Sequence, residues 1–160
     1  MAIGNIDSCD AGSGARFNDG KLQMGLVPVR IWLDYWQANF DWKTLVDLYD
    51  ILEELARFQE GEDDSAQKAL NVASSELMEQ TVGVLVFGAK KYKEWNWAKG
   101  MPWQVPIECC LRHARKIIEQ DEDIDEESGL PHMAHICCNL VMLAWFVRYY
   151  PDGDNRPPIN

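Results

Sequence analysis

Two histidines open the last long apolar stretch of the chain, within "DIDEESGLPHMAHICCNL" (123–140). On a helix with about 100° per residue, His132, His135 and Asn139 share one side. Imidazole nitrogens can bind a metal, and a helix N-terminus favours anions through its free N–H groups and its dipole. Alternatively, neighbouring helices can satisfy these side chains within the core, since an unpaired one costs roughly 1–3 kcal/mol. The residues alone leave the ligand-site and core interpretations open.

A second set of polar residues lies on "ELMEQTVGVLVFGAKKY" (76–92). Glu76, Glu79 and Lys90 are expected on one helical face, whereas apolar residues such as Val82 are expected to face the core. Carboxylates one turn apart are a common way to hold Mg²⁺ or Mn²⁺ through oxygen, and a lysine further along could meet a phosphate. The alternative is a solvated face with incidental charges, because a Glu-x-x-Glu pair alone is weak evidence.

A third polar set lies on "IECCLRHARKIIEQ" (107–120), which the apolar spacing predicts to be a helix. His113 falls at the edge of its apolar side and Arg112 on its more polar side. Arg112 is therefore either a phosphate clamp or part of a solvated basic face. Together the three helices would form a metal–phosphate pocket inside a helical bundle.

Apolar residues recur mostly at spacings of three and four, so the sequence predicts an all-α domain, a bundle of about five helices. The predicted helices cover residues 29–40, 42–60, 66–92, 107–120 and 131–149, with Asp41 as cap of the second and an interruption of the third near Ser74–Ser75. The Gly- and Ser-rich residues 1–19 are expected to form a flexible arm, residues 20–150 one domain, and residues 151–160 a disordered tail.

Charge and composition exclude several classes of partner. The formal net charge of the 160 residues is −11, which argues against binding of polymeric nucleic acid. A small phosphorylated ligand stays compatible, because divalent cations bridge carboxylates to phosphates. No apolar run approaches the ~18 residues of a membrane span, and no signal peptide is evident, so we expect a cytoplasmic protein. The five cysteines lack the Cys-x-x-Cys spacing typical of structural zinc sites, which favours reduced thiols.

Three stretches in order carry a family resemblance: "FNDGKLQMGLVP" (17–28), "FGAKKYKEWNWAKGMPW" (87–103) and "LRHARKIIEQDEDIDEESGLPHMAHICCNL" (111–140). They resemble the phage-encoded dATP/dGTP diphosphohydrolase N-terminal domain family, which is similar to the all-α MazG-like nucleotide pyrophosphohydrolases. The resemblance implies Mg²⁺- or Mn²⁺-dependent cleavage of a nucleoside triphosphate, dATP or dGTP, to monophosphate and pyrophosphate. It also implies a homodimer or homotetramer in the host cytoplasm.

The resemblance suggests roles for particular residues, with acidic side chains binding metal and basic ones neutralising phosphate. The metal ligands it suggests are Glu76, Glu79, Asp125, Glu127 and His132, and the catalytic residues Glu79, His132 and His135. The substrate-binding residues it suggests are Lys90, Lys91, Tyr92, Asn96, Trp97, Arg112, His113 and Asn139. Trp95, Trp97 or Trp103 could stack on a base, although each could equally pack in the core.

Two features depart from the family pattern. Residues 29–73 are an insertion, which could cover the pocket, build an oligomer interface or displace substrate contacts. They also bring a rival acidic cluster, Asp50, Glu53 and Glu54. Moreover, histidines stand where MazG-like enzymes carry a second acidic pair, which would favour Mn²⁺. A His/Asp-type metal phosphohydrolase and a non-catalytic protein that sequesters a nucleotide are the alternative functions.

Overall fold

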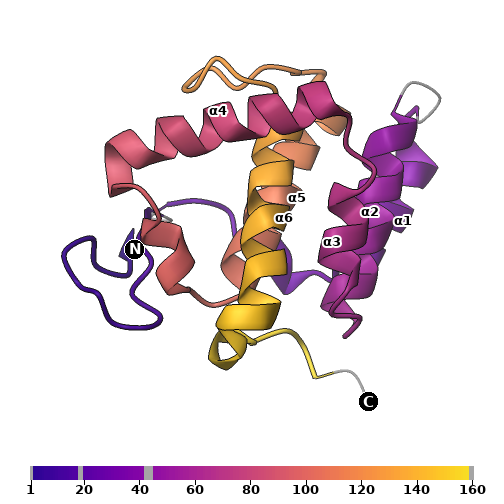
Figure 1. The fold of residues 1–160 in the computed structure, drawn as a ribbon. Helices are drawn as coiled ribbons and strands as arrows, with labels where there is room; N and C mark the ends of the chain where they lie inside the picture. Colours follow the sequence, from indigo (N-terminus) through magenta and orange to yellow (C-terminus); the bar gives the residue numbers. More distant parts are fainter. Residues whose placement is uncertain (1, 18–19, 42–44, 159–160) are drawn as a thin grey trace.

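Helix α6 runs through the centre of the molecule; α5 packs along it, α4 crosses its N-terminal end, and α1 to α3 lie together on one side (Figure 1). The computed structural model describes residues 2–17, 20–41 and 45–158. Its helices are α1 (Val29–Asn39), α2 (Val46–Gln59), α3 (Ser65–Leu70), α4 (Ser75–Tyr92), α5 (Gln104–Gln120) and α6 (His132–Tyr149). The all-α class is therefore confirmed.

The central place of α6 follows from its composition, because it is apolar on nearly every side. Ala134, Cys137, Leu140 and Phe146 point in different directions around the helix, and all are fully buried. The first turn of the same helix carries the two histidines, so its N-terminal end is the polar end of the core.

The third predicted helix is two helices in the structure, α3 and α4. The break falls at the predicted interruption, where Ser74 caps α4 by accepting a hydrogen bond from the N–H of Leu77 (3.1 Å). This break raises the number of described α-helices to six. The predicted start of the second helix at residue 42 lies outside the described residues. The described helix α2 begins at Val46 with Leu45 as its N-cap, so the expected cap at Asp41 is wrong.

The insertion forms part of the hydrophobic core. Trp36 of α1 and Leu52 of α2 are fully buried. The indole N–H of Trp36 also donates to Glu119 Oε2 on α5 (2.7 Å), which ties the inserted layer to the rest of the fold. We therefore regard α1 to α3 as a structural layer beside α6.

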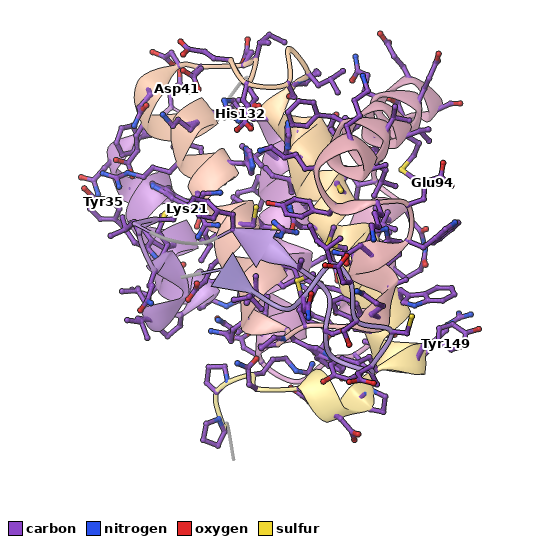
Figure 2. The ribbon with its side chains drawn as sticks, turned by 90° about the vertical axis from the view of Figure 1, so that its left-hand side faces the viewer. Lys21, Tyr35, Asp41, Glu94, His132 and Tyr149 are labelled. Atoms are coloured by element: carbon purple, nitrogen blue, oxygen red, sulfur yellow. The ribbon has the colours of Figure 1, made fainter. Side chains whose placement is uncertain are left out.

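The N-terminal segment packs on the helices through its backbone. Strands β1 (Ala2–Ile3) and β2 (Arg16–Phe17) pair antiparallel, and Figure 2 shows them lying across the face of α5 and α6. The N–H groups of Gly12 and Gly14 donate to the carbonyls of Lys99 and Gly100, at 2.7 and 2.8 Å. We call residues 12–17 the strap. The flexibility expected of residues 1–19 stays a prediction, but the strap is packed against the short helix η2 (Asn96–Lys99) in this structure.

The C-terminal segment also contacts the core. The Arg156 guanidinium lies over the rings of Phe58 and Trp103, 4.7 and 4.8 Å from their centroids, and donates to the carbonyl of Phe58 (2.8 Å). The side chain of Asn155 accepts from the N–H of Gln104 (2.9 Å), at the first residue of α5, three residues before the predicted start. The expected disorder of residues 151–160 thus stays a prediction for a segment that the structure shows packed up to residue 156.

Two short 3₁₀ helices complete the described elements, η1 (Met24–Leu26) before α1 and η3 (Pro151–Gly153) after α6. Within the described ranges no helix is both long and apolar enough to cross a membrane. All five cysteines are free thiols.

Candidate functional site

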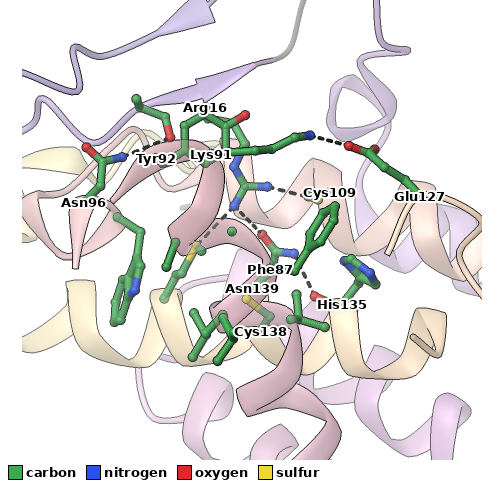
Figure 3. A pocket seen from close by; sticks show the side chains of 18 of the residues that line it. Arg16, Phe87, Lys91, Tyr92, Asn96, Cys109, Glu127, His135, Cys138 and Asn139 are labelled. Carbon is green, nitrogen blue, oxygen red and sulfur yellow. Dashed lines mark hydrogen bonds and ion pairs between the residues drawn. The ribbon is translucent and has the colours of Figure 1, made fainter. Parts of the chain in front are cut away.

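A cavity of about 680 Å³ lies among α4, α5 and α6 beside the strap (Figure 3). Most of the residues suggested for the site line it together. They are Lys91, Tyr92, Asn96, Trp97, Arg112, His113, Asp125, Glu127, His132, His135 and Asn139. The common cavity expected for the imidazoles and the acidic loop (residues 121–131) is therefore present.

Glu76, Glu79 and Lys90 do not join them. All three are exposed on α4 and none lines the cavity. The reason is the rotation of α4, which turns Thr81 and Val84 inwards and leaves the face with the two glutamates in solvent. The metal-ligand role suggested for Glu76 and Glu79, and the phosphate role suggested for Lys90, therefore find no support in this cavity.

The rival acidic cluster is also remote from the cavity. Glu53 forms an ion pair with Arg30 (2.6 Å) and Glu54 with Arg57 (2.8 Å), on the outside of α1 and α2. Neither these acids nor Asp50 line the cavity. Their geometry is that of a charged surface. No described residue of 29–73 lines the cavity, so the insertion does not cover it.

Three side chains form a cluster at the end of the cavity near the acidic loop. One potential ligand atom from each of His113, Asp125 and His132 lies within 4.8 Å of the other two. Nδ1 of His113 and Nδ1 of His132 are 2.8 Å apart, so one of them donates a hydrogen bond to the other. Two imidazole nitrogens and a carboxylate oxygen are a donor set that suits a transition metal more than Mg²⁺. His113, suggested as a substrate contact, thus lies in a cluster that could hold a metal ion.

The acidic loop fixes the tautomer of His132. Nε2 of His132 lies 2.6 Å from Glu122 Oε2, and an ionised carboxylate only accepts, so the proton sits on Nε2. Nδ1 of His132 is then the nitrogen with a lone pair, facing His113. A carboxylate that orients a histidine in this way is the usual outer partner of a metal-ligating imidazole.

Ser128, in the same loop, fixes both Asp125 of the loop and His135 of α6. Its N–H and its hydroxyl both donate to Asp125 Oδ2, each at 2.9 Å, and the hydroxyl oxygen lies 2.7 Å from Nε2 of His135. Because the hydroxyl proton goes to Asp125, Nε2–H of His135 is the donor to Ser128. Nδ1 of His135 therefore remains an acceptor.

These contacts explain two pKa shifts. Burial lowers the pKa of His135 to about 4, and the neighbouring His113 adds to this effect, so His135 is neutral at physiological pH. Burial alone would raise the pKa of Asp125, but the two hydrogen bonds from Ser128 hold it below its ordinary value. The loop thus presents an ionised carboxylate beside a neutral imidazole.

The rest of the lining is basic, in contrast with the whole chain. Six basic residues line the cavity: Arg16, Lys21, Lys91, Lys93, Arg112 and Lys116. Among the residues that the structure describes, three acidic ones line it as well: Glu94, Asp125 and Glu127. Since the chain has 26 acids and 15 bases, this local excess of positive charge indicates an anionic ligand.

Aromatic rings line several parts of the cavity, and Figure 3 shows Phe87 near Asn139 and His135. Trp97 and Tyr92 line it, and the Trp97 ring packs 6.3 Å from that of Phe146 near the end of α6. Trp95 also lines it and is largely exposed. Trp103, by contrast, is buried against Phe58 outside the cavity, so base stacking by Trp103 finds no support.

Several suggested substrate contacts are already engaged with the strap or the loop. The Asn96 side chain donates to the carbonyl of Ala15 (3.4 Å), and the Tyr92 hydroxyl accepts from the N–H of Phe17 (3.3 Å). Lys91 forms an ion pair with Glu127, which connects the C-terminal part of α4 to the acidic loop (Figure 3). These residues shape the walls of the cavity.

The sequence pattern missed Arg16, Lys21, Cys109, Glu122 and Ser128. Arg16 reaches from the strap to Cys109 Sγ on α5 (3.2 Å) and to Asn139 Oδ1 on α6 (3.0 Å). Burial would raise the pKa of the Cys109 thiol, but the Arg16 guanidinium, with a hydrogen bond from His113, holds it well below the ordinary value. The signal available was proximity to motifs: Arg16 immediately precedes "FNDGK", and Glu122 and Ser128 flank Asp125.

Comparisons with known proteins agree with these motifs. The family described as dATP/dGTP diphosphohydrolase, N-terminal, matches residues 57–156, so it includes residues 57–73 of the segment expected to be an insertion. A protein of Salmonella phage PMBT28 named dATP/dGTP diphosphohydrolase is 29% identical over 93 residues, which are 58% of this chain and 31% of the relative. The match thus spans less than a third of that relative's length. No solved structure matches significantly.

Proposed function

Because the chain belongs to the dATP/dGTP diphosphohydrolase N-terminal family, we propose that its cavity binds a purine deoxynucleoside triphosphate and cleaves it to monophosphate and pyrophosphate. One observation carries the proposal. The cavity joins a His113–Asp125–His132 cluster to cationic side chains such as Arg16 and to the rings of Tyr92 and Trp97. These are groups that could contact the metal, the phosphates and the base of a nucleotide.

His113, Asp125 and His132 would hold the metal, which we propose to be Mn²⁺ or Mg²⁺. The donor set fits, because Asp125 is ionised and Glu122 already keeps a lone pair on Nδ1 of His132. Two nitrogen donors make Mn²⁺ the better of the two ions. When bound, the metal supplies stabilisation of the negative charge that develops on the leaving pyrophosphate.

The reaction adds water across one phosphoanhydride bond. The water oxygen attacks phosphorus, the bond between the α- and β-phosphates breaks, and the water proton leaves with pyrophosphate or to solvent. His135 can orient the water through its Nδ1 acceptor, but a pKa of about 4 makes it a weak proton acceptor. Arg16, Lys21 and Arg112, which line the cavity, neutralise phosphate charge.

Product analysis tests this function. The protein is incubated with dATP, dGTP, dCTP and dTTP, with Mn²⁺ or Mg²⁺, and products are separated by ion-exchange chromatography. We expect monophosphate and pyrophosphate from the purine substrates, faster with Mn²⁺. Release of inorganic phosphate would instead favour a His/Asp-type phosphohydrolase, and tight nucleotide binding without turnover would favour sequestration.

A matched pair of variants assigns the activity to the cluster. Asp125→Asn removes the ionised ligand and is expected to lower kcat at least 100-fold, whereas Asp123→Asn changes an exposed neighbour that does not line the cavity. Equal activity of the two variants would contradict the site. We also propose that the protein forms a homodimer or homotetramer, which light scattering after size exclusion would measure.

A further inference from the structure

We propose that Arg16 of the strap is a phosphate-binding residue of this cavity. The inference rests on the proposed function and deepens it. Arg16 lies outside residues 57–156, so the family match does not cover it.

The three hydrogen-bond acceptors of Arg16 are an amide oxygen and two sulfur atoms, with no carboxylate among them. Its Nη2 donates to Asn139 Oδ1 (3.0 Å) and Met142 Sδ (3.2 Å), and its Nη1 donates to Cys109 Sγ (3.2 Å) (Figure 3). Within the described ranges no carboxylate forms an ion pair with it. By contrast, ion pairs with carboxylates are formed by Arg30, Arg57, Arg115 and Arg156.

Desolvating a cation is costly unless an opposite charge or strong acceptors compensate. Of the three partners, the Cys109 thiol is the one whose pKa the guanidinium lowers, and it contacts only Nη1. In a chain with 26 acids, a carboxylate could readily have filled this place. A phosphate group would supply the missing charge and the planar, two-point acceptor geometry that arginine prefers.

Neighbouring groups strengthen this assignment. Lys21 and Arg112 also line the cavity. Burial lowers the pKa of Lys21, and the nearby Arg112 and Arg16 add to the effect, whereas Cys109 and Glu127 oppose it. Lys21 therefore lies near two other cations, and one anionic group could contact them together. Asn139 lies seven residues beyond His132, about 10 Å along α6, so an extended polyphosphate could reach both the cluster and Arg16.

The backbone of the strap holds Arg16 in place. Gly14 N–H donates to Gly100 O (2.8 Å), and a Cβ on Gly14 would lie only 2.6 Å from that oxygen. The glycine therefore permits the close approach of two backbones just before the arginine. Such preorganisation suits a ligand contact, because little further ordering is needed on binding.

The rival explanation is that Arg16 serves only as counter-ion to a Cys109 thiolate. That explanation makes Arg16 a structural residue, so its removal should destabilise the fold. If Arg16 instead serves to bind phosphate, its removal should leave the ligand-free protein at least as stable as wild type. Stability and binding together separate the two.

The test measures binding of inorganic pyrophosphate by calorimetry in EDTA, and thermal unfolding without ligand. For Arg16→Met we expect binding about 10- to 100-fold weaker, with an unchanged or higher midpoint of unfolding. Arg16→Lys should recover part of the affinity. Arg148→Met, an exposed arginine on α6 outside the cavity, is the matched control and should bind normally. Unfolding of Cys109→Ser is measured alongside, to test the counter-ion explanation.

Several outcomes would overturn the proposal. Equal pyrophosphate binding by wild type and Arg16→Met would do so, as would a lower unfolding midpoint shared by Arg16→Met and Cys109→Ser. Parallel assays with dATP and dGTP separate this inference from the proposed function. Turnover with unchanged KM in Arg16→Met would sink the Arg16 role alone, whereas Arg16-dependent pyrophosphate binding without any turnover would sink the hydrolase alone.

Discussion

His132 is suited to bind a metal because a residue ten positions earlier determines which of its two ring nitrogens carries the proton. Glu122 accepts from Nε2, and this leaves the Nδ1 lone pair toward His113. Without Glu122 the imidazole could exchange tautomers and rotate, so fewer molecules would present the binding nitrogen. Glu122 is therefore a positioning residue that acts through His132.

Glu122→Ala is accordingly expected to weaken Mn²⁺ binding about 10- to 100-fold while the fold is retained. Isothermal titration with Mn²⁺, together with the circular dichroism spectrum, measures both properties. Glu126→Ala is the matched control, since Glu126 is an exposed acid of the same loop that does not line the cavity. If both variants bind Mn²⁺ as wild type does, the role of Glu122 is refuted.

His135 makes the stability of the protein depend on pH in a defined direction. Its pKa is about 4 in the folded protein and near 6.5 in an unfolded chain, so the unfolded chain binds the proton more tightly. Its contribution is therefore complete above about pH 6.5 and is lost as the pH falls towards 4, with a size on the order of 3 kcal/mol. His135→Gln, which cannot titrate, should flatten this slope.

Urea unfolding in EDTA at several pH values between 7.5 and 4.5 measures the slope for both proteins. The unfolding free energy of wild type should fall more steeply with acidification than that of His135→Gln. Asp125 titrates in a lower range, because its pKa is held below the ordinary aspartate value. Identical slopes above pH 5 would show that His135 is not the group responsible.

At the scale of elements, helix α4 shows where prediction from sequence ends. Its position in the chain was predicted well, but its rotation was not. Val82, expected in the core, is 57% exposed, whereas Thr81 and Val84 are buried. The helix is apolar on more than one side, so its periodicity does not select a face, and the choice is made by packing against α6 and Leu130. The placement of Glu76 and Glu79 failed for this reason.

The two glycines inside α4 should respond differently to substitution. A Cβ on Gly88 would meet no atom within 4 Å, so Gly88→Ala should stabilise the protein by up to about 1 kcal/mol through helix propensity. A Cβ on Gly83 would lie 3.3 Å from Leu130 Cδ1, so Gly83→Ala should gain less. Urea unfolding of both variants measures the difference, and a larger gain for Gly83→Ala would contradict this packing.

For the whole molecule, the contacts hardest to foresee are those between distant segments. The central apolar helix and the histidine stripe follow from local periodicity, and the structure places them as expected. Arg16 is 93 residues from Cys109 and 123 from Asn139, and no periodic pattern connects them. The short acidic loop likewise gave candidate acids, but its turn at Ser128 decided which of them faces the histidines. Such contacts depend on tertiary packing.

Arg156 connects the end of the chain to the inserted layer in the same way. Its side chain stacks on Phe58 and Trp103 and forms an ion pair with Asp63 (2.7 Å). Arg156→Ala is therefore expected to lower the free energy of unfolding by about 2–3 kcal/mol, with Arg156→Lys in between. Chemical denaturation measures this loss. If Arg156→Ala unfolds as wild type does, the tail contributes nothing to stability.

The position of α6 between the cavity and the inserted layer has a further consequence. Cavity-lining side chains come from Ala15, Arg16, Lys21 and residues 82–142, whereas the layer of α1 to α3 contacts α6 through α3. Substitutions on the exposed side of that layer can therefore change its surface while every cavity-lining group stays unchanged. Relatives sharing the same chemistry are free to differ widely in shape on that side.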